Sequence, residues 1–534
     1  MDEQRARRGS SSSTTSAATT TTRRRTIASS SSSLTDVASQ FWALGWTAFG
    51  GPTAHLGLFE SVFVQRLGWC SSSHFTEVVA VASALPGPTS TQVSFALGLV
   101  RGHGSLVCGL VSGFLFQYPG LLLMSVAGYL YASYAPVGPA RGEHVMHAVN
   151  VGGAAAGVAL VFLAVRSLAK KVCRGKRQAT IAVAVAVAGM MVQQKAGVTS
   201  FLYPVLIILS GLIELTCQRA VTRMRMMNAK RRREDDLDDD EDPMRAPLVN
   251  PANAEGSDGG DDEDDDAGDT LHGLGVAAGV FIFIAWAALL VFALVSVEFI
   301  EYTRAPWVHW WSTFFKAGSL TFGGGHVVLP LLMDEITQKY SPLVANCTVL
   351  HESTAPIASL PASSGAGAPG GSSFSAGAQT TSCGWVTTEQ FLFGLALVQA
   401  LPGPLFNLSA FLGAVMAIRS QINVLVGVAA AWLGLFTPGV LLIFSASSFW
   451  KGARNLAVYK DMLPGMNAAA VGLIMISCFT LFIQVLSMSA TPGLAASIGL
   501  IAASSIEVYN APAPLVILTG AALSVVASVC GIAV

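Results

Sequence analysis

The chain has 534 residues, of which 52% are hydrophobic and only 12% are charged, and its mean hydropathy is +0.56. These values exclude an ordinary soluble protein and indicate a polytopic membrane protein. The formal net charge is −1, but residues 234–269 hold 17 of the 32 acidic residues, so the rest of the chain is strongly basic. That excess of cations suits an anionic membrane surface or an anionic substrate, and solvation alone is an alternative explanation.

Residues 1–33 are rich in Ser, Thr and Arg and low in complexity, which predicts a disordered cytosolic tail. They lack the apolar core of a secretory signal peptide. An organellar transit peptide is an alternative because of the arginines at 23–25, although Asp2 and Glu3 count against it.

Apolar runs long enough to span a bilayer, which takes roughly 20 residues, follow this tail. The predicted spans are 34–58, 76–99, 105–131, 145–169, 179–193, 200–217, 272–297, 309–331, 388–417, 422–448, 464–486, 493–508 and 512–533. We assign 34–217 to a first membrane domain and 306–534 to a second. Between them, the basic run 219–233 and the acidic run 234–269 predict a charged, disordered linker over 218–271, and 272–297 is a connecting transmembrane helix.

The second domain repeats the first. Phe41, Gly45, Phe49, Gly50 and Gly51 recur 273 residues later, whereas the sequence ALPGP at 84–88 recurs at 400–404, 316 residues later. The difference locates an inserted surface loop of about 43 residues within 341–385. Cys347 and Cys383 bracket this insert and are a candidate disulfide.

One extra helix between two halves of about six spans makes the second half start on the opposite face. We therefore expect an all-α polytopic membrane protein of two inverted repeats, an arrangement typical of secondary transporters. Basic residues gather in the loops that this topology places inside, which supports the inversion and a cytosolic N-terminus. We expect a multi-pass protein of the plasma membrane. One feature opposes it, because Asn346 begins a glycosylation sequon in an insert assigned to the cytosol.

The repeated Pro-Gly-Pro sequence predicts a broken membrane helix. Proline fits the first position of a helix and the preceding glycine permits close backbone approach, so helices should start at Pro88, after Gly87, and at Pro404, after Gly403. A helix start presents free N–H groups that favour an anion, particularly a tetrahedral dianion. Further donors in the two first turns are Thr89, Ser90, Thr91 and Gln92 in the first copy and Asn407 in the second, so the copies should not be equivalent.

Glycine clusters precede both Pro-Gly-Pro motifs and are candidates to break helices and to add amide donors. They comprise Gly50, Gly51 and Pro52 in the first half and Gly323, Gly324 and Gly325 in the second. Close helix packing is the alternative role of any single glycine pair in a membrane helix.

Titratable side chains close to these motifs are candidates for charge and proton handling. His55 and His326 follow the glycine clusters and could carry a proton, or could simply be hydrogen-bonded. Lys316 lies within an apolar run and could attract an anion, neutralise Glu335 or extend to an interface. Glu335 is a third candidate for proton coupling.

With these motifs the chain resembles the chromate ion transporter (CHR) family. The motifs are Phe49-Gly50-Gly51-Pro52-x-Ala54-His55, Gly68-Trp69, Leu85-Pro86-Gly87-Pro88-x-x-x-Gln92, Phe322-Gly323-Gly324-Gly325, Leu329-Pro330-Leu331-Leu332 and Gln399 to Asn407. The resemblance implies the two-domain form, antiparallel halves, and transport of chromate, with sulfate as the similar oxyanion, driven by ion gradients or membrane potential. The chain departs from the family at Val62, where a carboxylate is frequent, which puts carboxylate coupling in the first half in doubt.

We interpret the chain as a secondary transporter that moves chromate by rocking of the two halves around a site at the bilayer midplane. Alternatives are an exchanger for sulfate or another oxyanion, a passive anion channel, and a membrane enzyme that acts on a lipid-linked phosphate. The expected partners are the oxyanion and the bilayer, with a homodimer left open, and neither a cofactor, a metal nor nucleic acid is expected.

Overall fold

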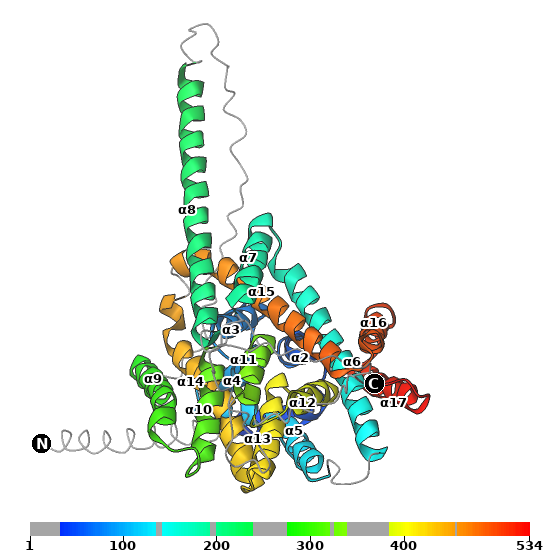
Figure 1. Cartoon of the computed structure of the whole chain (residues 1–534). Helices are drawn as coiled ribbons and strands as arrows, with labels where there is room; N and C mark the ends of the chain where they lie inside the picture. Colours follow the sequence, from blue (N-terminus) through cyan, green and yellow to red (C-terminus); the bar gives the residue numbers. More distant parts are fainter. Residues whose placement is uncertain are drawn as a thin grey trace, which may run out of the picture.

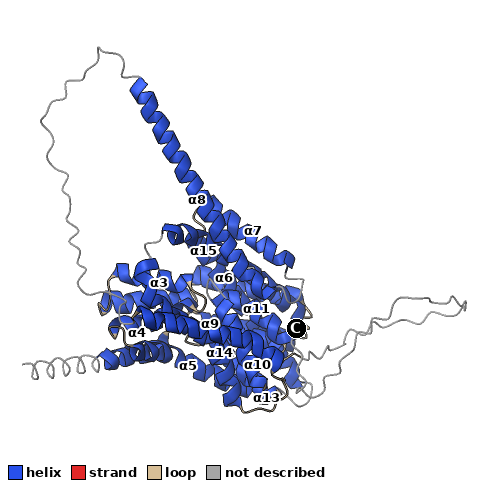
Figure 2. Cartoon of the chain, turned by 90° about the vertical axis from the view of Figure 1, so that its left-hand side faces the viewer, coloured by secondary structure: helices blue, strands red, loops and turns tan. Residues whose placement is uncertain are grey.

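The computed structural model describes residues 33–134, 141–192, 199–238, 275–320, 325–338, 384–453 and 457–534, and they form a bundle of α-helices (Figures 1 and 2). The predicted all-α class is therefore confirmed. The predictions for the tail before residue 33, for the insert with Asn346, Cys347 and Cys383, and for Gly323 and Gly324 concern residues outside this description.

After a helix over 33–47, the first half continues as one π-helix and a series of α-helices. These are α2 (Gly51–Phe59), η1 (Glu60–Arg66), α3 (Ser72–Ala84), α4 (Thr89–Arg101), α5 (Leu106–Tyr134), α6 (Arg141–Val172), α7 (Lys176–Val192) and α8 (Thr199–Asp238). The rest of the chain comprises α9 (Val276–Phe299), α10 (Pro306–Leu320), α11 (Gly325–Gln338), α12 (Thr388–Ala400), the 3-10 turn η3 (Leu405–Asn407), α13 (Leu408–Arg419), α14 (Val424–Ala453), α15 (Ala457–Met488), α16 (Pro492–Tyr509) and α17 (Ala513–Val529).

Seven helices among the described residues are long and apolar enough to cross a bilayer: Leu106–Tyr134, His144–Val172, Val205–Arg231, Val276–Phe299, Val424–Phe449, Asp461–Met488 and Pro492–Tyr509. The other predicted spans differ from continuous helices in two ways. The runs 34–58, 76–99 and 388–417 are each divided into shorter segments, and α7 and α17 have only 17 residues each, whereas 309–331 includes residues 321–324, which lie outside the description. Hydropathy averages over a Gly- or Pro-containing break, so it counts two half-length helices as one span.

The helix α8 corrects the predicted start of the disordered linker. Residues 218–238 continue α8 as part of one 40-residue helix, which projects from the bundle (Figure 1). This segment contains neither Gly nor Pro and holds six Arg, three Met and two Ala, which are favourable residues in a helix. Charge alone therefore did not prevent helix formation here.

The order of helices repeats, but the two halves are interleaved in space. The second-half helices α12, α15 and α16 each begin 316 residues after their first-half counterparts α3, α6 and α7. Helix α6 packs against α12, α16 and α17 of the second half, whereas α15 packs against α7 and α8 of the first. Each of the four buried hydrophobic clusters in the described part of the chain contains residues of both halves. The halves are thus repeats of sequence that share their cores.

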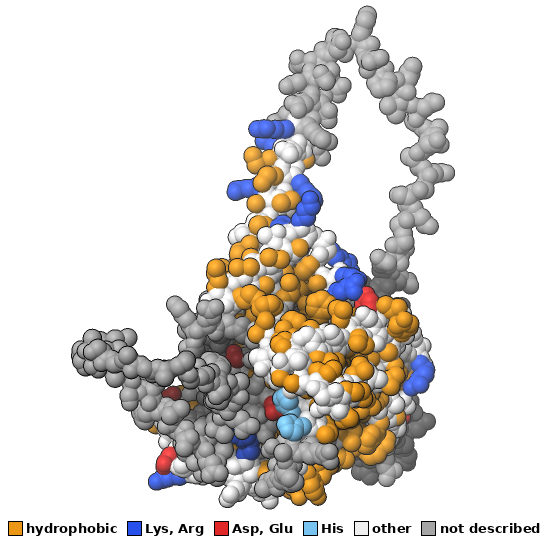
Figure 3. Space-filling view, turned by 45° about the vertical axis from the view of Figure 1, so that its right-hand side comes forward, with side chains coloured by type: hydrophobic (Ala, Val, Ile, Leu, Met, Phe, Trp, Pro, Cys, Tyr) orange, Lys and Arg blue, Asp and Glu red, His pale blue; other side chains and the backbone are white. Residues whose placement is uncertain are grey.

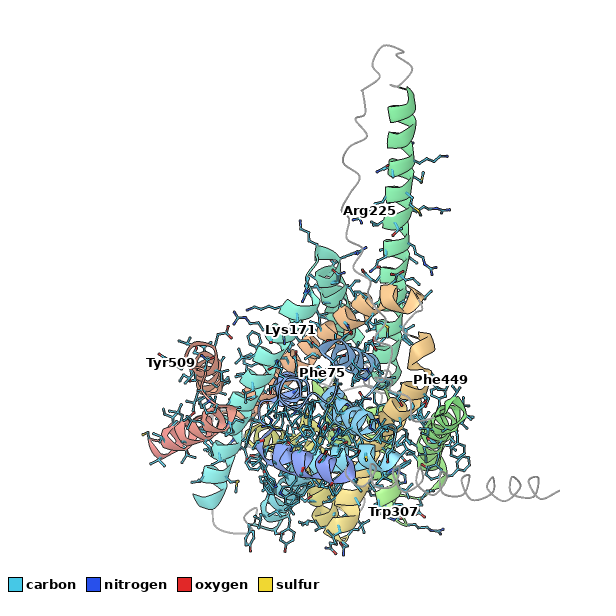
Figure 4. The ribbon with its side chains drawn as sticks, turned by 180° about the vertical axis from the view of Figure 1, so that it is seen from behind. Phe75, Lys171, Arg225, Trp307, Phe449 and Tyr509 are labelled. Carbon is cyan, nitrogen blue, oxygen red and sulfur yellow. The ribbon has the colours of Figure 1, made fainter. Side chains whose placement is uncertain are left out.

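Side chains at the surface follow this arrangement. Figure 3 shows hydrophobic side chains over the face of the bundle below α8, and Lys and Arg side chains along α8 and beside its base. Figure 4 places Lys171 and Arg225 toward the same end of the molecule and Trp307 toward the other.

Candidate functional site

The two Pro-Gly-Pro sequences adopt the same backbone conformation. Leu85 and Leu401 are extended at the ends of α3 and α12, and Gly87 and Gly403 have φ values of +119° and +109°. Only glycine adopts such angles without strain. Helix α4 starts at Thr89 with Pro88 as its N-cap, and Pro404 is the N-cap of η3, which leads into α13. Both prolines lie at helix breaks, within one residue of the predicted starts.

Each Pro-Gly-Pro loop packs against a Pro-Gly pair in the other half. A Cβ atom on Gly87 would lie 3.0 Å from the Cα of Gly439, and one on Gly120 would lie 2.3 Å from Asn407 Nδ2. The buried Gln92 amide donates to Pro86 O (2.8 Å) and to Gly439 O (3.3 Å). The contacts with Gly439 and with Asn407 cross from one repeat to the other in both directions.

Asn407 makes the matching contacts from the second half. Its Nδ2 donates to Gln117 O (3.1 Å) and its Oδ1 accepts from Trp432 Nε1 (3.1 Å). We expect Asn407→Leu to destabilise the protein by about 1–3 kcal/mol for each buried partner left unpaired. Thermal unfolding in detergent measures this loss. The exposed Asn423, changed to Ala, is the control and should have the smaller effect, because water can replace its hydrogen bond to Leu425 N–H; an Asn407→Leu variant as stable as the control would contradict this role.

A cavity of about 240 Å³ lies where the two repeats meet. Its wall includes equivalent positions of the two halves, 316 residues apart: Ser83 with Gln399, and Thr89 with Leu405. Gly50, Gly51, Pro52, Leu56, Leu401 and Gly403 complete the side formed by the repeated motifs. The rest of the wall comes from α6 (Leu160, Ala164, Leu168, Val172), α15 (Asn467, Ala470, Ile474), Ala513 and, next to Gln399 on α12, Val398.

Three helix starts reach this cavity. Helix α2 begins at Gly51, next to Gly50 in the left-handed conformation (φ +91°), α4 begins at Thr89, and η3 begins at Leu405. The first helical hydrogen bond of α4 runs from Gln92 N–H to Pro88 O (2.9 Å). The N–H groups of the residues before Gln92, in the first turn, therefore have no partner within the helix. Gly403 N–H donates to Ala48 O (2.8 Å) and so holds the second loop beside the first glycine cluster.

The wall is neutral. None of the described residues that line the cavity carries a charge, and its polar side chains are those of Ser83, Thr89, Gln399 and Asn467. Gln399 Nε2 is already engaged with Gly157 O and Leu395 O (both 3.1 Å). Backbone amides at helix starts, supported by hydroxyl and amide groups, are donors that suit a small anion.

The structure brings part of the predicted site to this cavity. Gly50, Gly51, Pro52, Thr89 and Gly403 line it. The remaining predicted residues of the two Pro-Gly-Pro motifs are not among those that line the wall: Gly87, Pro88, Ser90, Thr91, Gln92, Pro404 and Asn407. Gly325 begins α11, and Gly323 and Gly324 precede the described part of that helix.

The charged and titratable candidates lie away from the wall. Lys316 Nζ forms an ion pair with a carboxylate oxygen of Glu335, and neither side chain lines the cavity. His55 is fully buried, with Nε2 3.2 Å from Ala48 O and Nδ1 3.4 Å from Ser90 Oγ. These contacts agree with the alternative expectation that His55 is simply hydrogen-bonded. The His326 side chain lies outside the described part of the chain.

Three polar residues of the wall, Ser83, Gln399 and Asn467, were not among the predicted site residues. Each lies within or at the end of an apolar helix, the same signal that singled out Lys316. Ser83 and Gln399 lie one residue before the repeated ALPGP sequence, so extending that repeat backward would have found them.

Comparison with known proteins agrees with this architecture. The family model described as chromate transporter matches residues 35–215 and 377–525, more than half of the chain. A chromate transport protein of Pseudomonas aeruginosa is 25% identical over 445 residues, covering 83% of this chain and 79% of its own length. A probable chromate transport protein of Synechococcus elongatus is 32% identical over 139 residues, 26% of this chain and 33% of that protein. No solved structure matches the chain.

Proposed function

The chain belongs to the chromate transporter family, and from this premise we propose that it is a secondary transporter that moves chromate through the cavity, with sulfate as a related or competing anion. Family membership also makes it a transport protein rather than an enzyme. The observation that carries the proposal is the convergence of the starts of α2, α4 and η3 on one cavity between the repeats.

The neutral wall suits transport of a dianion. N–H groups at a helix start favour negative charge, each start contributing roughly 0.3–1 kcal/mol and up to about 2 kcal/mol where partly buried. A fixed cation in the wall would bind a dianion more strongly and slow its release. Binding by dipoles and hydroxyls is weaker than binding by a fixed cation and so favours release on the other side.

We place the movement between two groups of helices that differ from the two sequence halves. The cavity wall divides into a side formed by α2, α3, α4, α12 and η3 and a side formed mainly by α6 and α15. Because the buried clusters join residues of both halves, rocking of one half against the other would break every cluster. Displacement of α6 and α15 against the repeated motifs changes access with fewer broken contacts.

The cavity wall reaches the basic end of α6. Lining residues run from Leu160 to Val172, the last residue of that helix, beside the exposed Lys170 and Lys171. Positive residues at the end of a span mark the cytosolic side. In the proposal this conformation therefore offers the site to the cytosol, and the lysines attract the anion toward it.

The test uses the full chain in liposomes and radiolabelled chromate, with imposed pH and voltage gradients. We expect Thr89→Val to raise the KM for chromate about tenfold, because a hydrogen bond to a charged group contributes about 1.5 kcal/mol or more and 1.4 kcal/mol corresponds to about tenfold. Thr519→Val is the matched control, since its hydroxyl bonds to Val516 O in its own helix, away from the cavity. Equal KM values in the two variants would remove Thr89 from the site.

The same vesicles separate the remaining alternatives. Sulfate that competes with chromate and is itself accumulated would make sulfate exchange the main activity. Unitary currents that follow the voltage alone would indicate a passive anion channel.

A further inference from the structure

A second polar cluster joins the repeats outside the cavity. Glu389 at the start of α12 accepts from Asn150 Nδ2 through Oε1 (2.8 Å), and the same oxygen lies 3.0 Å from His147 Nδ1. Asn150 Nδ2 also donates to Tyr131 Oη (3.1 Å). The His147 and Glu389 side chains, which hold α6 to α12, are 35% and 36% exposed and are therefore not enclosed within the protein.

This cluster lies at the end of α6 opposite to its lysines. Ten residues separate Asn150 from Leu160 on α6, and ten separate Glu389 from Gln399 on α12, about 15 Å of helix in each case. The two helices are in close contact between these points: a Cβ atom on Gly157 would lie 3.1 Å from the Cα of Ala396, and Gln399 Nε2 donates to Gly157 O. The α6–α12 contact therefore separates the cavity from the face where the cluster lies.

The groups around this pair come from α5, α6, α13, α15 and the C-terminal segment. Tyr131 faces the cluster from α5, and the exposed His144 lies one turn earlier on α6. Arg419 of α13 is directed to Gln390 Oε1 (3.4 Å) and Gly384 O (3.2 Å). From the end of α15 and the C-terminal segment, backbone carbonyls of Met488 and Val534 contact His147. Among these described neighbours, none is a cation bonded to the Glu389 carboxylate other than His147.

We propose that His147 and Glu389 form the site at which a co-transported proton is taken up or released on the face opposite the basic end of α6. This inference rests on the proposed chromate transport. When α6 separates from α12 to open the cavity toward that face, the His147–Glu389 contact breaks and both groups meet water. Uptake of one proton adds one positive charge to the pair and offsets part of the charge of the anion.

The experiment measures three activities of the full chain in liposomes. Chromate-for-chromate exchange at equal pH needs no net proton movement, whereas accumulation driven by a pH gradient does; a trapped pH-sensitive dye reports the proton flux that follows chromate addition. We expect Glu389→Gln, which keeps an acceptor for Asn150, to lower gradient-driven accumulation and chromate-linked proton flux at least about tenfold. Exchange should stay within about twofold, and His147→Gln should behave in the same way. Glu507→Gln, which removes a carboxylate paired with Arg166 between α6 and α16 (2.6 Å), is the control and should retain all three activities.

The outcomes separate this inference from the function on which it rests. An unaltered protein that does not exchange chromate would refute the proposed function. Normal exchange in the unaltered protein, together with undiminished proton flux in Glu389→Gln, would overturn the proton site alone. Loss of exchange as well as proton flux, in a variant with normal thermal unfolding, would also overturn it, because the pair would then act in opening the cavity.

Discussion

Replacing Gly51 with alanine is expected to lower the chromate transport rate at least about tenfold while the protein stays folded. Gly51 has a φ of +78°, lines the cavity, and begins α2, and a Cβ atom there would meet no atom within 4 Å. The added methyl group would project into open space in front of the helix start, where the anion has to approach the amides. Transport should suffer from the lost approach and not from a clash within the protein.

Gly531→Ala separates this effect from backbone strain. Gly531 has nearly the same φ (+83°), and a Cβ atom at this position would also meet no atom within 4 Å, but Gly531 does not line the cavity. Both variants should lose about 1–2 kcal/mol of stability, the usual penalty of a left-handed backbone for an L-residue. The initial rate of labelled chromate uptake and the thermal unfolding of both variants distinguish blocked approach of the anion from backbone strain. Equal transport rates in the two variants would show that Gly51 matters only for the backbone conformation.

The breaks in the membrane helices could be predicted because their causes are local. Pro and Gly restrict or release the backbone at the residue itself, so ALPGP at 84–88 and 400–404 gave both helix starts to within one residue. The repeat could be recognised for the same reason, since it needs only the order of residues. The continuation of α8 to Asp238 was missed because a dense charge run was given more weight than the helix-forming residues within it.

The orientation of side chains around each helix could not be predicted in the same way. In a helix such as α15 apolar residues cover almost the whole circumference, so sequence does not indicate which face meets a neighbour. Asn467 therefore gave no sign that it faces a cavity, whereas Gln92 and Asn407, predicted as ligands, hold the opposite repeat. Those contacts join residues 347 and 290 positions apart, and only the packed structure reveals them.

The second large effect is expected at Lys316. We assign this residue a role in the stability of the protein and not in binding the anion. Its ion pair with Glu335 leaves the two side chains only 20% and 13% exposed. Removing one partner of a largely buried ion pair costs on the order of 3–5 kcal/mol, so Lys316→Met should lower the thermal stability sharply. Arg304→Met is the control, because Arg304 and Glu301 are 84% and 63% exposed and such surface pairs contribute little.

The double variant Lys316→Met, Glu335→Met distinguishes the two roles. Replacing both charges with apolar side chains removes the carboxylate together with the ammonium group, and exchanges of this kind in protein interiors are often neutral or stabilising. We therefore expect the double variant to regain most of the lost stability and to transport chromate with a KM within about twofold of the unaltered protein, because neither side chain lines the cavity. A stable double variant whose KM rises about tenfold would mean that the ammonium group attracts the anion from outside the wall, and the neutral cavity would then no longer account for binding.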